Sequence, residues 1–356
     1  VIMRANYALE HGTEALSMCV RKAVNEMLGS LAEDAGIRRE DVFQVCVVGN
    51  TCMHHLFLGI SPASLVHAPY TPAVSERLVL NAGDYGLAVQ ERAELIMLSD
   101  IAGYVGADTC GCLLAIRQDQ QEEISLMIDI GTNGEMVLGN RERMVTCSTA
   151  AGPAFEGAKI ECGMRGAAGA VDHVKYEDGK WNYTTVGNKP AVGLCGSGLI
   201  DLVAGLLDAG MLDENGVLRS GQEKQGVFIL VPPERGGNER GVYLTQKDLG
   251  EVQLAKAAIA AGIQMLMERI GITEDDICSV YIAGAFGNYM DPVSAGKIGL
   301  LPATLVKKVK PVGNAAGEGA KIALVNEKEM LEMDELVRKI EFVELAASAD
   351  FQDHFI

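Results

Sequence analysis

Short apolar runs alternate along this chain with longer segments in which apolar residues return every three or four positions. Three of the apolar runs, Val45–Val48, Ser125–Ile130 and Val280–Ala283, are each followed at once by a glycine. Short apolar runs bounded by glycine are typical of buried strands, whereas longer periodic segments are typical of helices. The pattern therefore predicts an α/β fold.

One helix–turn–strand unit occurs twice. Residues 31–49 align without a gap on residues 266–284, which lie 235 positions further along, and seven of the 19 pairs are identical. Each copy predicts a helix end, a glycine able to take the left-handed cap conformation, an acidic turn, an apolar strand and a second glycine. Solenoid repeats have periods of roughly 20–50 residues, so this spacing favours two similar lobes that face one cleft. Chance recurrence of the same punctuation is the alternative.

Length and charge narrow the function classes. The chain has 356 residues, more than the roughly 250–300 at which one core stops growing, so two domains are expected. Its 48 acidic and 30 basic residues give a net charge of −18, which argues against a nucleic-acid partner. No apolar run has the length of a membrane span, and nine cysteines without a CxxC pair suit a reducing compartment. We expect a cytoplasmic protein with no membrane partner.

A predicted hairpin carries the strongest candidate chemistry. Asp129 stands near the end of the strand 125–130, where its carboxylate could hold a hydrated Mg²⁺, and Glu135 on the next strand could orient an attacking water. The turn offers backbone and side-chain donors to phosphate oxygens. These donors are Gly131, Thr132, Asn133 and Gly134. An ordinary Asn-Gly hairpin, with Asp129 as a turn residue, is the alternative, and for Glu135 an exposed strand glutamate is the favoured interpretation.

Three further motifs rich in small residues could border a ligand. The run Ser148–Ala158 leaves room for a ligand or for close packing, and a Gly-Ser-Gly turn before a helix predicted at 199–209 places N–H groups at a positive helix end. A glycine turn follows the strand that ends at Ala283, and ligands of α/β sheets sit at such carboxyl ends. A plain helix cap and core packing are the alternatives. The residues concerned are Gly152, Gly196, Ser197, Gly198, Gly284, Ala285, Phe286 and Gly287.

Two other segments, Ser99–Asp108 and Val312–Ala320, predict helices with very small residues, which can cross closely at a hinge between lobes. Two adjacent histidines, His54 and His55, follow the first-lobe glycine. Neighbours on a helix do not converge on one ion, so we expect a structural or partner-facing role rather than metal binding, with Asn50 and Thr51 capping the helix.

The order of these parts resembles the acetate and sugar kinase, heat-shock chaperone and actin superfamily. A closer resemblance, over nearly the whole chain, is to the C-terminal ATPase region of the ATP-dependent reductive activators of corrinoid proteins. The strings that carry it are Val48–Gly59, Asp129–Glu135, Ser148–Ala158, Gly163–Gly166, Cys195–Asp201 and Ala283–Gly287.

This resemblance implies a two-lobe, actin-like and ribonuclease-H-like ATPase fold with an internal pseudo-repeat. Residues 1–98 would form an incomplete first lobe and residues 99–120 a connecting helix. Residues 121–311 would form the second lobe, and residues 312–356 a second connecting helix with a return to the first lobe.

The resemblance also implies ATP and Mg²⁺ as cofactors and the corrinoid protein of a methyltransferase system as partner. Such activators drive an electron from a two-iron, two-sulfur domain onto a Co(II) corrinoid. The chain has no four-cysteine cluster spacing, and the first phosphate loop is expected upstream of Val1. Half of the phosphate clamp would then be absent from this fragment, so whether it binds nucleotide by itself stays open, and we expect it to have no redox activity alone. Whether it is itself an enzyme or a homodimer stays open, and a small-molecule kinase and a non-catalytic docking or dimerisation module are the alternatives.

Overall fold

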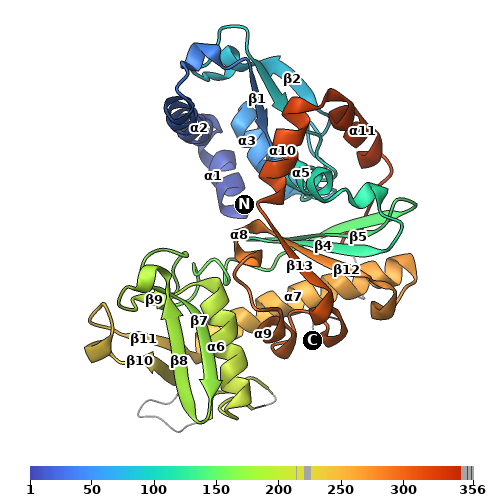
Figure 1. Ribbon diagram of the computed structural model, residues 1–356. Helices are drawn as coiled ribbons and strands as arrows, with labels where there is room; N and C mark the ends of the chain where they lie inside the picture. The colour runs from blue at the N-terminus through green and yellow to red at the C-terminus, as the bar shows by residue number, and fades with distance from the viewer. Residues whose placement is uncertain (214, 220–225, 346–350, 352–353, 355–356) are drawn as a thin grey trace. The chain divides into compact units, whose positions relative to one another are not determined.

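A computed structural model describes residues 1–213, 215–219, 226–345, 351 and 354 (Figure 1). The chain divides into two compact units. Unit 1 comprises Val1–Glu122, Asn140–Thr146 and Asn314–Phe342, and unit 2 comprises Glu123–Gly139, Cys147–Gly313 and Val343–Ile356. The lobe boundaries expected from the sequence stay a prediction.

Unit 1 is built on a small sheet with strand order β1-β3-β2, in which β1 is parallel and β2 antiparallel to β3. Apolar side chains of the sheet and of α3, among them Phe57, Leu95 and Met97, form its core together with Leu87. Its elements are α1 (Ile2–His11), α2 (Glu14–Ala35), β1 (Gln44–Val47), α3 (Thr51–Leu58), α4 (Ala63–Val66), β2 (Leu78–Asn81), β3 (Glu94–Met97), α5 (Ala107–Ile116), α10 (Ala315–Val325), α11 (Glu327–Val337) and β14 (Glu341–Phe342).

Unit 2 contains a larger mixed sheet with the order β13-β12-β4-β5, which continues into β6 (Met144–Thr149). The predicted hairpin is confirmed as the antiparallel pair β4 (Ser125–Ile130) and β5 (Gly134–Gly139). The strand β12 (Ser279–Ala283) runs parallel to β4 and to β13 (Val309–Gly313). The helices that accompany this sheet in unit 2 are α7 (Gln246–Ile270), α8 (Gly284–Gly287) and α9 (Pro292–Lys297).

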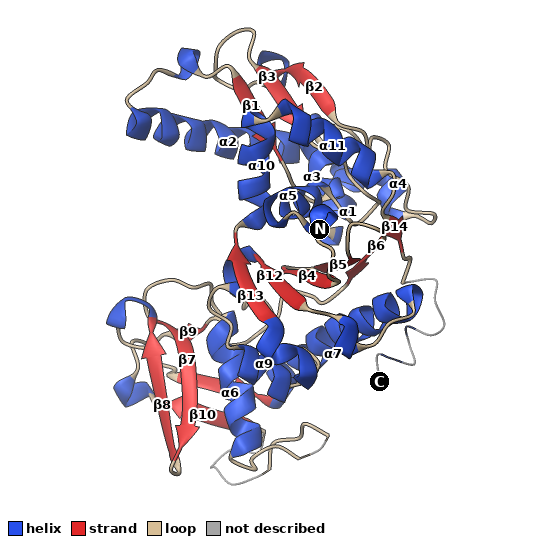
Figure 2. Cartoon of the chain, turned by 45° about the vertical axis from the view of Figure 1, so that its right-hand side comes forward, coloured by secondary structure: helices blue, strands red, loops and turns tan. Residues whose placement is uncertain are grey.

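The rest of unit 2 is a three-stranded sheet, a two-stranded ribbon and the helix α6 (Gly196–Asp208) (Figure 2). The sheet has the order β8-β7-β9, and α6 packs along β7. A Cβ on Gly198 of α6 would overlap the carbonyl oxygen of Val171 on β7, so glycine is needed for this contact. The strands are β7 (Ala170–Glu177), β8 (Lys180–Thr185), β9 (Gly193–Leu194), β10 (Val227–Val231) and β11 (Val242–Thr245).

The predicted repeat is confirmed at the level of local structure. The helices α2 and α7 both end in a left-handed glycine, Gly36 with φ 66° and Gly271 with φ 84°. A short 3-10 turn closed by a capping box follows each glycine and leads into β1 and β12. The copies differ at their ends, because Gly284 has φ +87° and α8 begins there, whereas Gly49 has no such positive φ.

The connecting helix expected at 99–120 is shorter, because α5 begins only at Ala107. Asp100 accepts a hydrogen bond from the Ala107 backbone N–H at 2.9 Å and so marks the helix start. The helices α5 and α10 do cross closely, since a Cβ on Gly319 would overlap the carbonyl of Gly111, but the expected hinge between lobes stays a prediction. Both helices belong to unit 1.

Within the part of the chain that the structure describes, no helix combines the length and the apolar character needed to cross a bilayer.

Candidate functional site

The β4–β5 hairpin that carries the candidate phosphate loop lies next to the glycine turn that follows β12, and Asp129 is the residue where the two meet. On one side Asp129 pairs in register with Glu135 of β5, and on the other with Ala283 of β12. A Cβ on the next residue, Gly284, would lie 2.9 Å from the Asp129 Oδ1 atom. Only a glycine fits there without displacing the carboxylate, and its positive φ also favours glycine. The two sequence motifs therefore form one local structure.

Two acidic side chains, Asp129 and Glu135, share one face of the sheet at this place. Directly opposed residues of an antiparallel pair share one face of the sheet, with Cβ atoms about 5 Å apart. Burial raises the pKa of Asp129 above its ordinary value of 3.8. Glu135 is only 8% exposed, so the expectation of an exposed strand glutamate is wrong. The reason is that β5 lies inside the sheet and α7 covers it.

Such a pair suits a hard divalent cation. Like charges opposed across strands repel each other, and burial strengthens the repulsion, so a cation between or beside them would relieve both effects. Among the described residues, no group of three or more His, Cys, Asp or Glu side chains could hold a metal ion. This arrangement fits Mg²⁺, which keeps several waters and takes one or two carboxylates plus substrate phosphates.

The turn between β4 and β5 is closed from within. The Gly131 backbone N–H donates to the carbonyl of Asn133 at 2.9 Å. The Thr132 hydroxyl donates to Oε1 of Glu156 at 2.9 Å. Gly134 is buried, and a Cβ there would lie 2.8 Å from the Thr149 hydroxyl oxygen, so its missing side chain serves packing.

Glu156 is a site residue that the sequence reasoning missed. It holds the turn through Thr132 and is the only acidic residue in the small-residue run Ser148–Ala158. A single acidic residue among small ones was the sequence signal that could have identified Glu156 as a candidate site residue.

The Gly-Ser-Gly motif lies inside α6 rather than before it. Cys195 is the extended N-cap, and its carbonyl accepts the Leu199 N–H at 2.9 Å, so the helix starts at Gly196. The backbone N–H groups of Gly196, Ser197 and Gly198 thus belong to the first turn, which has no partners one turn earlier in the helix. A positive helix end remains at this place, three residues earlier than expected.

A cavity of about 630 Å³ lies within unit 2 beside this helix end. Its size is in the range of small-molecule sites, about 300–1,000 Å³. The rings of Phe155 and Phe286 stack in its wall, with centroids 5.6 Å apart and planes 17° apart. The lining residues are Phe155, Glu156, Met164, Arg165, Gly166, Asp172, Val186, Gly187, Cys195, Gly196, Ser197, Phe286 and Tyr289.

The cavity unites some of the predicted residues and not others. Gly196, Ser197 and Phe286 line it, and Glu156 connects it to the phosphate turn. Gly152 is a turn glycine with φ +76° whose Cβ direction is open, and a Cβ on Gly287 would contact Ile282 at 2.6 Å. Ala285 lies in α8. Arg165, Asp172 and Tyr289 were not anticipated, because strands and loops far apart in the sequence bring them together.

The two histidines of α3 are buried and have separate partners. His54 Nδ1 lies 3.3 Å from Oδ2 of Asp100, and His55 Nδ1 lies 2.8 Å from the carbonyl of Thr51. The Ala73 N–H donates to His55 Nε2 at 2.9 Å. These contacts favour the expected structural role of His54 and His55 over metal binding.

The expected helix cap is half correct. Asn50 accepts the Cys52 N–H at 2.9 Å and caps α3, as expected. Thr51 does not cap the helix, because its hydroxyl donates to the carbonyl of Ala102 instead.

Comparison with known proteins gives matches over the whole chain. Residues 123–356 match the family model described as the C-terminal domain of RACo, the ASKHA domain, and residues 1–121 match the RACo middle region. The chain is 35% identical to the corrinoid activation enzyme RamQ of Eubacterium limosum, with 100% of this chain and 63% of that protein covered. It is 29% identical to a [Co(II) methylated amine-specific corrinoid protein] reductase of Methanosarcina barkeri, over 76% of this chain and 52% of that protein.

A solved structure of a reductive activator for a corrinoid, iron-sulfur protein matches with a TM-score of 0.91 and 38% identity. The match covers 99% of this chain and 58% of that one. The predicted actin-like α/β fold and the predicted family resemblance are thereby confirmed. This chain spans between about half and two thirds of the length of these relatives.

Proposed function

Because the chain belongs to the RACo family and carries its C-terminal ASKHA domain over residues 123–356, we propose that unit 2 binds ATP with Mg²⁺. Membership of an ASKHA family implies nucleotide binding. The observation that carries the proposal here is the joint placement of Asp129, Glu135 and the glycine turn at Gly284.

We assign roles by chemistry. Asp129 would hold Mg²⁺ through its carboxylate. The backbone N–H groups of Thr132 and Asn133 and the first turn of α6 would donate hydrogen bonds to phosphate oxygens, while Gly131, whose N–H closes the turn, would let the backbone approach them. Glu135 would orient the water that attacks the terminal phosphorus, so that the bond to the bridging oxygen breaks and ADP leaves. Phe286 and Tyr289 in the cavity wall would contact the adenosine. Gly152, Gly198, Ala285 and Gly287 would shape the surrounding backbone.

In the whole protein we propose that nucleotide binding drives reductive activation of a Co(II) corrinoid protein of a methyltransferase system. The names of the relatives support this, since one is a corrinoid activation enzyme and another a Co(II) corrinoid protein reductase. A ligand that binds one of two conformations more tightly shifts the population and with it the affinity for a partner. The iron–sulfur electron donor, a homodimer, the cytoplasmic location and the lobe ranges stay predictions.

The test is isothermal titration of the 356-residue chain with a non-hydrolysable ATP analogue and Mg²⁺. We expect micromolar binding that Asp129→Ala weakens at least tenfold, about 1.4 kcal/mol. Removing Mg²⁺ with a chelator should weaken the wild type and leave Asp129→Ala unchanged. Asp275→Ala, which removes an exposed carboxylate elsewhere in unit 2, is the matched control and should bind like the wild type.

Other results would favour other functions. No heat with any variant would contradict nucleotide binding by this chain, and binding of a corrinoid protein that ignores nucleotide would then identify a docking module. ATP turnover that rises with a sugar or a carboxylate substrate would identify a small-molecule kinase instead.

A further inference from the structure

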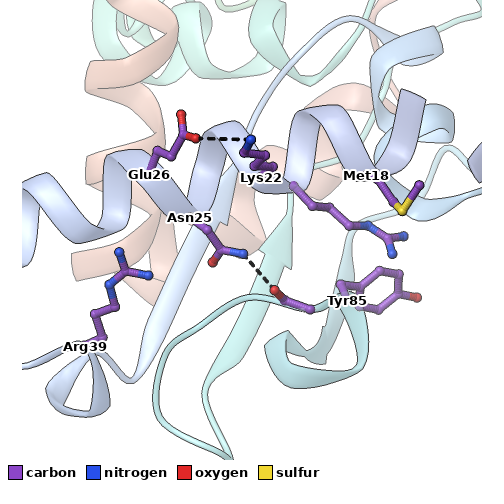
Figure 3. Close-up of a pocket in the computed structure, with 8 residues that line it drawn as sticks. Met18, Lys22, Asn25, Glu26, Arg39 and Tyr85 are labelled. Atoms are coloured by element: carbon purple, nitrogen blue, oxygen red, sulfur yellow. Dashed lines mark hydrogen bonds and ion pairs between the residues drawn. The ribbon is translucent and has the colours of Figure 1, made fainter. Parts of the chain in front are cut away.

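A groove on α2 in unit 1 concentrates positive charge in an acidic chain. It has a volume of about 460 Å³ and carries three cations, Arg21, Lys22 and Arg39, against the single carboxylate of Glu26. The chain as a whole has a net charge of −18. Asn25, Met18, Tyr85 and Gly86 complete the lining (Figure 3). We refer to this feature as the α2 groove.

The walls of the α2 groove are held in place by other contacts. Arg21 donates from Nε and Nη2 to the carbonyl of Phe57, at 2.9 and 2.7 Å, and its guanidinium lies 5.1 Å from the centroid of the Tyr85 ring. Asn25 donates to the carbonyl of Gly86 at 2.8 Å and accepts the N–H of Ala88 at 2.7 Å. Fixed walls lower the entropy cost of binding a ligand.

Arg39 is the cation available to a ligand. A Cβ on Gly29 of α2 would overlap its guanidinium, so a glycine at that position gives Arg39 its place beside the helix. Within the described part of the chain, no hydrogen bond or ion pair engages the guanidinium of Arg39, whose backbone carbonyl accepts the N–H of Val42 at 3.0 Å. The guanidinium of its neighbour Arg38, by contrast, pairs with Asp41 at 2.8 Å. A half-buried guanidinium of this kind would gain from a ligand carboxylate.

The spacing of the cations indicates the shape of the ligand. Arg21 and Gly29 are eight residues apart on α2, which corresponds to about 12 Å along the helix. In Figure 3, Arg39 lies at one end of the groove and Met18 and Tyr85 lie at the other. A single phosphate cannot bridge that distance, but an extended peptide rises about 3.3 Å per residue, so acidic residues about four positions apart would reach both ends.

The chemistry of the lining agrees with a peptide rather than a phosphate. The groove runs along the middle of a 22-residue helix, so it offers no helix N-terminus to an anion. Methionine, tyrosine and arginine are enriched at protein interfaces. We propose that the α2 groove binds an extended acidic segment of a partner protein. This proposal is independent of nucleotide binding, because all the residues that line the groove belong to unit 1.

The test is fluorescence anisotropy of a labelled hexaglutamate peptide with the 356-residue chain at low salt. Since the net charge of the chain repels an acidic peptide, binding requires a local cationic site. We expect saturable binding that Arg39→Gln weakens at least fivefold and that Lys22→Gln weakens two- to threefold. Lys22 is highly exposed, so its substitution leaves folding intact and keeps the test valid if Arg39→Gln unfolds the chain.

The matched control is Arg338→Gln, which removes one exposed positive charge at the residue that follows α11 in unit 1 and should change the affinity less than twofold. A labelled hexaglutamine peptide should not bind. Equal affinity in Arg338→Gln, Arg39→Gln and Lys22→Gln would overturn the proposal. Pyrophosphate binding that depends on Arg39, without peptide binding, would also overturn it and would identify a small-oxyanion site.

Discussion

At the scale of single residues, the environment of Asp129 has opposite effects on folding and on the proposed binding of a cation. Its carboxylate is desolvated, and this burial raises its pKa and disfavours the ionised form. The same features suit it to a bound cation, which favours the ionised form. Function and stability therefore oppose each other at this position, as they often do at ligand sites.

We predict that Asp129→Asn raises the thermal midpoint of the nucleotide-free chain at pH 7. Because folding raises the pKa of Asp129 above 3.8, its stabilising contribution is complete below that pH and is lost as the pH rises. The neutral amide avoids this loss, so the gain should vanish as the pH falls towards 4. Scanning calorimetry between pH 4 and pH 8 measures the effect.

The control substitution, Asp41→Asn, is expected to change the thermal midpoint in the opposite direction. Hydrogen bonds from Arg38 lower the pKa of Asp41, so its contribution to stability is present above the ordinary aspartate pKa of 3.8 and is lost as the pH falls. Asp41→Asn should therefore lower the midpoint at pH 7. A lower midpoint for Asp129→Asn at pH 7 would contradict the account given for this residue.

At the scale of elements, glycines decide how closely helices approach other backbone. The crossing of α5 and α10 depends on Gly111 and Gly319. Neither residue has a side chain, so the backbones of the two helices come into direct contact there. Gly250 on α7 is different, because a Cβ there would meet nothing within 4 Å. Glycine is therefore required by packing at Gly319 but not at Gly250.

We predict that Gly319→Ala destabilises the chain by about 2–3 kcal/mol, since the new methyl group would overlap backbone that cannot rotate away. Gly250→Ala should instead stabilise it by about 0.5–1 kcal/mol, because alanine loses less backbone entropy in a helix. Urea unfolding followed by circular dichroism compares the two. Equal effects of the two substitutions would show that the crossing is looser than described.

At the scale of the whole molecule, excess negative charge opposes compactness. The net charge of −18 is spread over 356 residues, and self-repulsion of this kind destabilises the folded state. Salt screens it, since the Debye length falls from about 30 Å at 0.01 M to about 8 Å at 0.15 M.

We therefore predict that the thermal midpoint rises by a few degrees between about 0.02 M and 0.3 M sodium chloride. Choline chloride at equal ionic strength should act in the same way, because screening does not depend on the identity of the cation. Scanning fluorimetry measures both series. A fall in the midpoint with added salt would mean that attractive ion pairs outweigh the repulsion.

Features that depend on neighbours in the chain could be predicted from the sequence. The hairpin that carries Asp129, the left-handed glycines Gly36 and Gly271 and the cap at Asn50 follow from turn and capping chemistry acting over a few residues. The family resemblance also rested on contiguous strings. The sequence alone therefore determined the kind of fold and the position of its phosphate-loop candidate.

Only the tertiary structure decided which distant residues meet. The burial of Glu135, the bond from Thr132 to Glu156, the cavity that joins Phe155 to Tyr289 and the position of Arg39 beside Gly29 all depend on contacts between separate segments. Local periodicity specifies which face of a strand or helix is apolar, but it does not specify what packs against that face. That choice follows from the close packing of all elements together, which is why these features emerged only in three dimensions.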